Sequence, residues 1–238
     1  MFSSNTEQKP ANLVAFAFLL IAFLTGIASS FQLPTLSLFL TQEIRVSPTM
    51  VGTFYAINAV IGIILSQVLA RYSDRQNDRR KVIIFCCAVA ILGCLLFAYS
   101  RNYYMLALFG TTLLGFGSSS NPQSFALARE YAEKTKREAV MFTTIMRTQI
   151  SLAWIVGPPL SFAIALNWGF DFMYLVAALA FLFCALITAT LLPKIVRQPH
   201  VNTQTTVQAP RAHRKSVLYL FIALFLIWTC NSMYLINM

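Results

Sequence analysis

The sequence predicts an all-α protein that crosses a membrane several times, and three observations lead to this fold class. The 238 residues are 58% hydrophobic and only 11% charged, a balance that soluble domains do not show. Several apolar runs reach the roughly 20 residues that a helix needs to span a bilayer. Lysine and arginine gather in alternate connections between these runs, as they do in helical membrane proteins.

Seven apolar segments are expected to be membrane helices. Their ranges, in chain order, are 13–40, 49–70, 82–98, 104–127, 139–166, 172–192 and a last run that starts near 216 and is still continuing at 238. The third and sixth lack strongly polar side chains, so we expect them to face lipid at the periphery. The other segments carry polar residues and are expected to line an interior. In the first, Gly26 and Ser30 form a small-residue pair that favours close helix approach.

The first six segments form two similar triplets, each with two polar-laced helices followed by an apolar one. Because each unit has three spans, the second enters the membrane from the opposite side, which gives an inverted repeat. Such repeats are typical of secondary transporters with a site near the middle of the bilayer. The sequence thus predicts a six-span bundle over 1–192, a polar linker over 193–215 and the first span of a truncated second bundle over 216–238.

The placement of basic residues predicts the orientation. Five Lys and Arg lie in the connection 71–81, four in 129–138 and five in the linker, whereas the connections on the other side hold only Arg45 and Arg101. The positive-inside rule therefore places the N-terminus and the linker in the cytoplasm. It also explains the net charge of +10 without nucleic acid as a partner.

The fifth segment carries an arginine within an apolar run. Arg147 would cost at least about 2.5–3.5 kcal/mol in mid-membrane, so such a residue normally faces a bundle interior or a water-filled cavity. Arg147, Ser151, Trp154 and Pro158 share one helix face. A cation, a hydroxyl and an indole on one stripe can hold a polyhydroxylated ligand. The alternative is an arginine that snorkels, or that pairs with an acid and fixes the helix packing.

Amide side chains in other polar-laced segments are further candidates for a substrate site. Gln32, Asn58 and Asn121 can donate to and accept from sugar hydroxyls, and Asn231 in the last segment is added to this set. The alternative for each is a hydrogen bond between packed helices. Gly157 and Pro158 are expected to bend the fifth helix, because proline removes a backbone donor.

The charged connection 71–81 resembles the hallmark loop of the major facilitator superfamily. Asp74, Arg75 and the Arg79–Arg80 pair match its acid, arginine and basic pair. Ala70 and Asn77 stand where the family has glycines, and Asp78 is one residue more than the pattern. The resemblance implies a cytoplasmic latch between helices of the two halves that breaks during alternating access, made by Asp74, Arg75, Arg79 and Arg80 with Glu130 as an ionic partner. The alternative is a solvated charge run that only sets topology.

Within that superfamily the chain is most similar to the bacterial sugar efflux transporter family. The segments that carry this resemblance are PTLSLFL at 34–40, DRRK at 78–81, FALAREYA at 125–132, SLAW at 151–154, GPP at 157–159 and WTCN at 228–231. The resemblance implies a major facilitator fold and export of lactose, glucose and thiogalactosides across the inner membrane by proton antiport. Arg147 and Trp154 match a pair with which sugar permeases of the superfamily hold their substrate. The acid that partners that arginine falls opposite Arg129, beside Glu130.

Other function classes have less support. The five cysteines lie in apolar runs without zinc spacing, so no metal site is expected. A membrane-embedded enzyme would need a histidine or an acid pair at the interface, and the sequence shows none there, so no enzymatic activity or cofactor is expected. The core of the six spans contains no acid, which leaves Glu130 or a residue outside this chain as a proton carrier. The alternative is facilitated export down an existing sugar gradient, without protons. A drug exporter would need a hydrophobic cavity. A non-transporting remnant is the third alternative, since the family continues through a C-terminal half, the missing partner of this chain.

Overall fold

The computed structural model describes residues 10–76, 78–135 and 138–193, together with residues 219, 222–227 and 229. The chain divides into two compact units, Met1–Val196 and Arg197–Met238. The few described residues of the second unit are helical. Most of the predicted linker, the predicted start of the last span and Asn231 lie outside the described residues.

All secondary structure assigned in the described residues of the first unit is helical. Its elements are α1 (Ala11–Gln42), α2 (Pro48–Arg75), α3 (Arg79–Tyr99), α4 (Tyr103–Met105), the π-helical turn η1 (Leu106–Gly110), α5 (Thr111–Lys134) and α6 (Ala139–Leu191). The local sequence explains where several of these helices begin. Asp78 caps α3 by accepting from the backbone N–H of Arg80, and Asn102 caps α4 in the same way. Pro48 stands in the first turn of α2, where its missing N–H costs nothing.

The six predicted spans fall on α1, α2, α3, η1 with α5, and the two parts of α6. Four helices (α1, α2, α3 and α6) are long and apolar enough to cross a membrane. At 53 residues α6 would be about 80 Å long if straight, far more than one bilayer crossing needs. Its dihedral angles break at Gly169, whose φ of 88° suits glycine. The expected five-residue loop at 167–171 is therefore too long. The chain changes direction at the single residue Gly169, and the residues on either side of it are helical.

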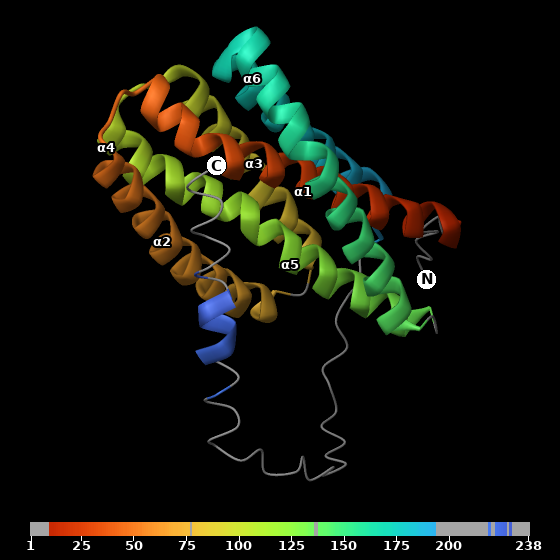
Figure 1. Ribbon diagram of the computed structural model, residues 1–238. Helices are drawn as coiled ribbons and strands as arrows, with labels where there is room; N and C mark the ends of the chain where they lie inside the picture. Colours follow the sequence, from red (N-terminus) through yellow and green to blue (C-terminus); the bar gives the residue numbers. More distant parts are fainter. Residues whose placement is uncertain are drawn as a thin grey trace. The chain divides into compact units, whose positions relative to one another are not determined.

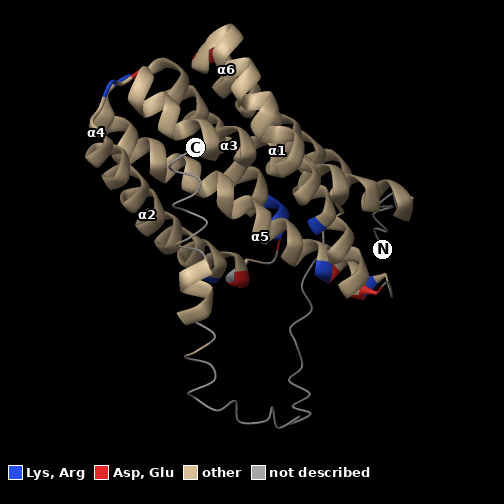
Figure 2. Ribbon diagram, viewed as in Figure 1, with Lys and Arg blue, Asp and Glu red and all other residues tan. Residues whose placement is uncertain are grey.

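Successive passes run in opposite directions, and side-chain contacts at the two ends demonstrate it. At one end, Arg79 at the start of α3 bonds to residues near the ends of α2 and α5. At the other end, Arg101 after α3 bonds to Glu43 after α1 and to Asp171 just past the turn in α6. We call these the Arg79 end and the Arg101 end. Figure 1 shows the helices of this unit lying side by side, and Figure 2 shows long uncharged stretches along them.

The bundle core is apolar and includes an aromatic cluster toward each end. Ring contacts near the Arg79 end join Phe18, Tyr131 and Phe142, and those near the Arg101 end join Phe39, Phe97, Phe170 and Tyr174. Edge-to-face and offset packing of such rings adds to the energy of their burial.

The expected lipid-facing helices do present apolar stripes outward. Phe85, Leu92 and Tyr99 are exposed on one face of α3, while the opposite face is buried. Among the polar-laced helices, α2 is little enclosed by the rest of the unit. In the most apolar stretch of α2 only 11% is buried, against 50% in that of α3. The reason is that α2 packs mainly against α5 and has little contact with α1.

Small residues let α1 and the first half of α6 cross closely, which confirms the prediction for Gly26 and Ser30. A Cβ on Gly26 would lie 2.8 Å from the Cβ of Ala153, and one on Gly157 would lie 1.8 Å from the Ser30 hydroxyl oxygen. Gly157 therefore serves this packing. The predicted bend at Gly157 and Pro158 stays a prediction, since the one residue of α6 with non-helical dihedral angles is Gly169.

Candidate functional site

A stripe of side chains along α5 lines two hollows, one after the other. The first is bordered on α5 by Thr111, Leu114, Gly115 and Ser118, and the second by Asn121, Pro122, Phe125, Ala126 and Arg129. These residues recur every three or four positions and so share one face of the helix. The stripe runs over 18 residue steps, about 27 Å of helix, which is most of a bilayer core.

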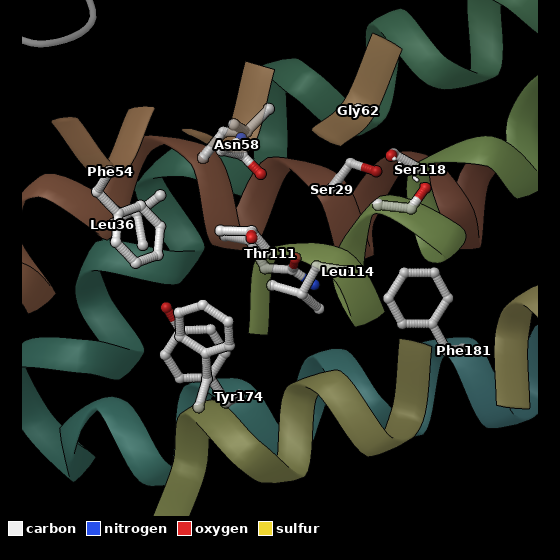
Figure 3. Close-up of a pocket in the computed structure, with 14 residues that line it drawn as sticks. Ser29, Leu36, Phe54, Asn58, Gly62, Thr111, Leu114, Ser118, Tyr174 and Phe181 are labelled. Carbon is white, nitrogen blue, oxygen red and sulfur yellow. Dashed lines mark hydrogen bonds between the residues drawn. The ribbon is translucent and has the colours of Figure 1, made fainter. Parts of the chain in front are cut away.

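The first hollow, which we call the aromatic hollow, has a volume of about 120 Å³. Polar side chains of Ser29, Gln32, Asn58 and Ser118 contribute to its wall, and rings of Phe54, Phe97, Tyr174 and Phe181 form much of the rest. Figure 3 shows Asn58, Ser29 and Ser118 on one side, across from Tyr174 and Phe181. Its volume is below the range of typical ligand pockets, so it holds a few waters or part of a ligand.

Tyr174 is a site residue that the sequence analysis missed. It is fully buried on α6, and its hydroxyl has no hydrogen-bond partner among the described residues. A buried hydroxyl without a partner is costly, and water or a ligand commonly satisfies it. A tyrosine within an otherwise apolar span was the available signal.

The second hollow, which we call the arginine hollow, is larger, at about 590 Å³, and more open. Arg129 on α5 and Thr143 and Arg147 on α6 line it with Asn121 and Phe125. Its volume lies within the range of small-molecule sites. Arg147 is exposed and has no ion pair among the described residues. The alternative of a structural arginine paired with an acid therefore finds no partner in this part of the chain.

A hydrogen bond between α1 and α5 lies where the lining passes from one hollow to the other. The Thr25 hydroxyl donates to Oδ1 of Asn121 at 2.5 Å, and the adjacent turn of each helix supplies Ser29 and Ser118 to the aromatic hollow. Asn121 thus makes the interhelical bond that was its alternative role, and it still lines the arginine hollow.

The structure divides the expected sugar-binding residues between the two hollows. Gln32 and Asn58 line the aromatic hollow, and Asn121 and Arg147 line the arginine hollow. Gln32 also donates weakly to the Cys94 sulfur, at 3.5 Å. Trp154 is half-buried and lines neither hollow. Asn231 is outside the described residues.

The charged residues expected to form a latch meet around Arg79. Its guanidinium donates to Glu130 at 2.9 Å, to Asp74 at 2.6 Å, to Ser73 at 3.0 Å and to Gln123 at 3.1 Å. The Arg79 side chain is only 9% exposed. A buried guanidinium of this kind is tolerable because its donors are satisfied and two carboxylates balance its charge.

Arg75 and Arg80 were also expected to form the latch, and the described structure does not place either of them in the Arg79 cluster. Arg80 instead donates to the backbone carbonyl of Ala189 near the end of α6, at 2.7 Å. The reason is helical geometry, since adjacent residues point about 100° apart. The side chain of Arg75 is outside the described part of the structure. Asp78, the additional residue of the loop, caps α3.

A family model and several curated proteins match this chain. The sequence model of the Major Facilitator Superfamily matches residues 18–238. The chain is 53% identical to sugar efflux transporter A of Dickeya chrysanthemi over 236 residues, which are 99% of this chain and 60% of that protein. It is 51% identical to sugar efflux transporter B of Salmonella typhimurium, over 97% of this chain and 58% of that one. For sugar efflux transporter C of Escherichia coli the identity is 49%, over 99% and 60%. The chain thus spans about three fifths of the length of these relatives.

Proposed function

Because this chain belongs to the major facilitator superfamily, we propose that it is the N-terminal half of a secondary transporter that exports sugars by alternating access. Lactose, glucose and thiogalactosides are the proposed substrates. The proposal draws on relatives named as sugar efflux transporters, which are about half identical to this chain over nearly all of it. Since the chain spans about three fifths of their length, the proposed partner is a C-terminal half that supplies the other wall of the substrate path.

The observation that carries the proposal is the lined stripe along α5. Hydroxyls and amides face rings in the aromatic hollow, and a guanidinium stands beside Phe125 in the arginine hollow. Sugars present hydroxyl groups at their edges and C–H groups on their ring faces, so they need this combination of polar and aromatic walls. The Arg147 guanidinium is a fixed fork of donors that suits two neighbouring hydroxyls.

The proposed setting is the bacterial inner membrane, with the Arg79 end in the cytoplasm. This chain is a multi-pass membrane protein. The connections 71–81 and 129–138, which hold most of the basic residues of the first unit, both lie at the Arg79 end. In the same orientation Asp74, Arg79 and Glu130 serve as the cytoplasmic latch, and Arg75 and Arg80 contribute positive charge beside it.

Proton antiport is the proposed driving force, with Glu130 as its candidate in this chain. None of the described residues that line the two hollows is acidic. Glu130 lies on α5, the helix that lines both, and is bonded to Arg79. A proton taken up by this carboxylate would weaken that ion pair, which couples protonation to the latch. Efflux that depends on the pH gradient in the unaltered protein and not in Glu130→Gln would support this assignment.

The main experiment is efflux of labelled lactose and glucose from membrane vesicles that contain the full-length protein. We expect Arg147→Gln to lower sugar efflux at least about tenfold, because several hydroxyl bonds to a charged group are lost, and Arg147→Lys to recover part of it. Thr148→Val is the matched control, since Thr148 is exposed next to Arg147 and does not line either hollow. Normal efflux in Arg147→Gln, or no sugar efflux by the unaltered protein, would refute the proposal.

A further inference from the structure

The arginine hollow has a charge distribution that neutral sugars do not require. Two of its lining residues, Arg129 and Arg147, are cationic, and none of its described lining residues is acidic. The remaining polar groups are the amide of Asn121 and the hydroxyl of Thr143. A cleft lined by one sign of charge concentrates ligands of the opposite sign.

Neighbouring carboxylates do not cancel this charge. Glu130, next to Arg129, points about 100° away around α5 and bonds to Arg79 at 2.9 Å. Glu133 pairs with Arg129 at 3.2 Å, but both side chains are largely exposed, and an exposed pair of this kind is worth under about 1 kcal/mol. The Arg129 guanidinium can therefore be shared with a ligand, and Arg147 has no ion pair among the described residues.

We propose that the arginine hollow is an entry site that prefers acidic sugars, those that carry a carboxylate, over neutral and amino sugars. This inference rests on the proposed function and specifies its substrate class. A guanidinium and a carboxylate form two parallel hydrogen bonds. Phe125 and Pro122 supply an apolar wall for the ring face. Arg129 is one residue from Glu130 at the Arg79 end, so a ligand that enters from that end meets the arginines before it reaches the aromatic hollow.

The test uses three sugars with the same ring and different charge: glucuronate, glucose and glucosamine. Ala126 lines the arginine hollow, and Ala126→Cys in the full-length protein gives a site for alkylation by a maleimide. Cys86, Cys87, Cys94 and Cys184 are buried, and the parent protein without the new cysteine measures the background. We expect half-maximal protection at about tenfold lower concentration for glucuronate than for glucose, with glucosamine weakest.

Two changes should remove this order if the arginines cause it. Arg129→Gln should reduce the difference between glucuronate and glucose to less than about twofold, and Glu133→Gln, the matched control, should keep or increase it. In the unaltered hollow the difference should shrink when ionic strength rises from about 0.1 to 1 M, because the screening length falls from about 10 to 3 Å.

The outcomes separate this inference from the proposed function. If glucose and glucuronate protect equally, or if their difference survives Arg129→Gln and high salt, the preference for acidic sugars is refuted while sugar export stands. If none of the three sugars protects the cysteine or is exported, both are refuted.

Discussion

The two ends of α3 carry arginines with similar partners and different surroundings. Arg79 begins the helix, and its side chain is 9% exposed among acceptors on α2 and α5. Arg101 follows the helix, and its side chain is 33% exposed. It donates to Glu43, to Asp171 and to carbonyl groups that end α3, and its guanidinium lies over the ring of Phe39. Each arginine therefore joins three parts of the bundle, but only one does so away from water.

The difference in burial determines what each arginine can contribute. A buried ion pair that loses one partner leaves an uncompensated charge, which typically costs about 3–5 kcal/mol. An exposed pair contributes only about 0.2–1 kcal/mol and weakens in salt. The Arg79 cluster thus fixes α2, α3 and α5 to each other at one end, whereas the links of Arg101 can open and re-form at low cost. This makes the Arg79 end the stiffer one.

The strongest test of this comparison is Arg79→Gln. Glu130 and Asp74 would face each other's charge without the guanidinium, so we expect a loss of about 3 kcal/mol or more in the free energy of unfolding. The measurement is the thermal midpoint of the detergent-solubilised full-length protein, followed by fluorescence-detected size exclusion.

Arg80→Gln is the matched control for this loss. It removes the same charge one residue away, where the guanidinium bonds to a backbone carbonyl on α6. We expect a change of less than about 1 kcal/mol. Equal losses in the two variants would mean that the net charge of the loop matters and the Arg79 cluster does not.

The two acids around Arg79 should contribute differently to stability, and the less exposed one should contribute more. The Glu130 side chain is 20% exposed and that of Asp74 is 59% exposed. We expect Glu130→Gln to cost about 1–2 kcal/mol of stability and Asp74→Asn less than about 1 kcal/mol. If the cluster is a latch, Asp74→Asn should lower the turnover number for sugar efflux several-fold and leave the KM within about twofold. Unchanged transport at normal expression would contradict the latch.

The sequence predicted those properties of the bundle that depend on one helix at a time. Apolar length predicted the helices α1, α2, α3 and α6, and the pair Gly26 and Ser30 correctly indicated a close crossing. Single-helix periodicity also put Arg147 on a stripe that does line a hollow. It could not show that Trp154 lies off that hollow, because Trp154 is on the same face but about 10 Å farther along the helix, and the extent of the hollow depends on the neighbouring helix α5.

The features that the sequence could not predict depend on which helices meet. The expected sugar-binding amides fall into two hollows because Thr25 of α1 bonds to Asn121 between them. Tyr174 acquires its importance only through burial without a partner. The ion pairs of Arg101 could not be predicted, because its partners Glu43 and Asp171 are 58 and 70 residues away in the chain. Its charge was used only to predict the orientation. Contacts over such separations leave no local pattern.

The expected effect that sharpens the comparison most is that of Arg101→Gln. Its two acids are exposed enough to be hydrated once the guanidinium is gone, so we expect a loss of about 1 kcal/mol at low ionic strength. That loss should largely disappear in 1 M salt, where exposed charges are screened, whereas the loss in Arg79→Gln should remain because buried charges are screened much less. The same thermal midpoint, measured for both variants at low and high salt, decides this. A salt-independent loss in Arg101→Gln as large as that in Arg79→Gln would mean that the Arg101 end is as rigid as the Arg79 end, and that the two ends do not divide the work of alternation as their burial indicates.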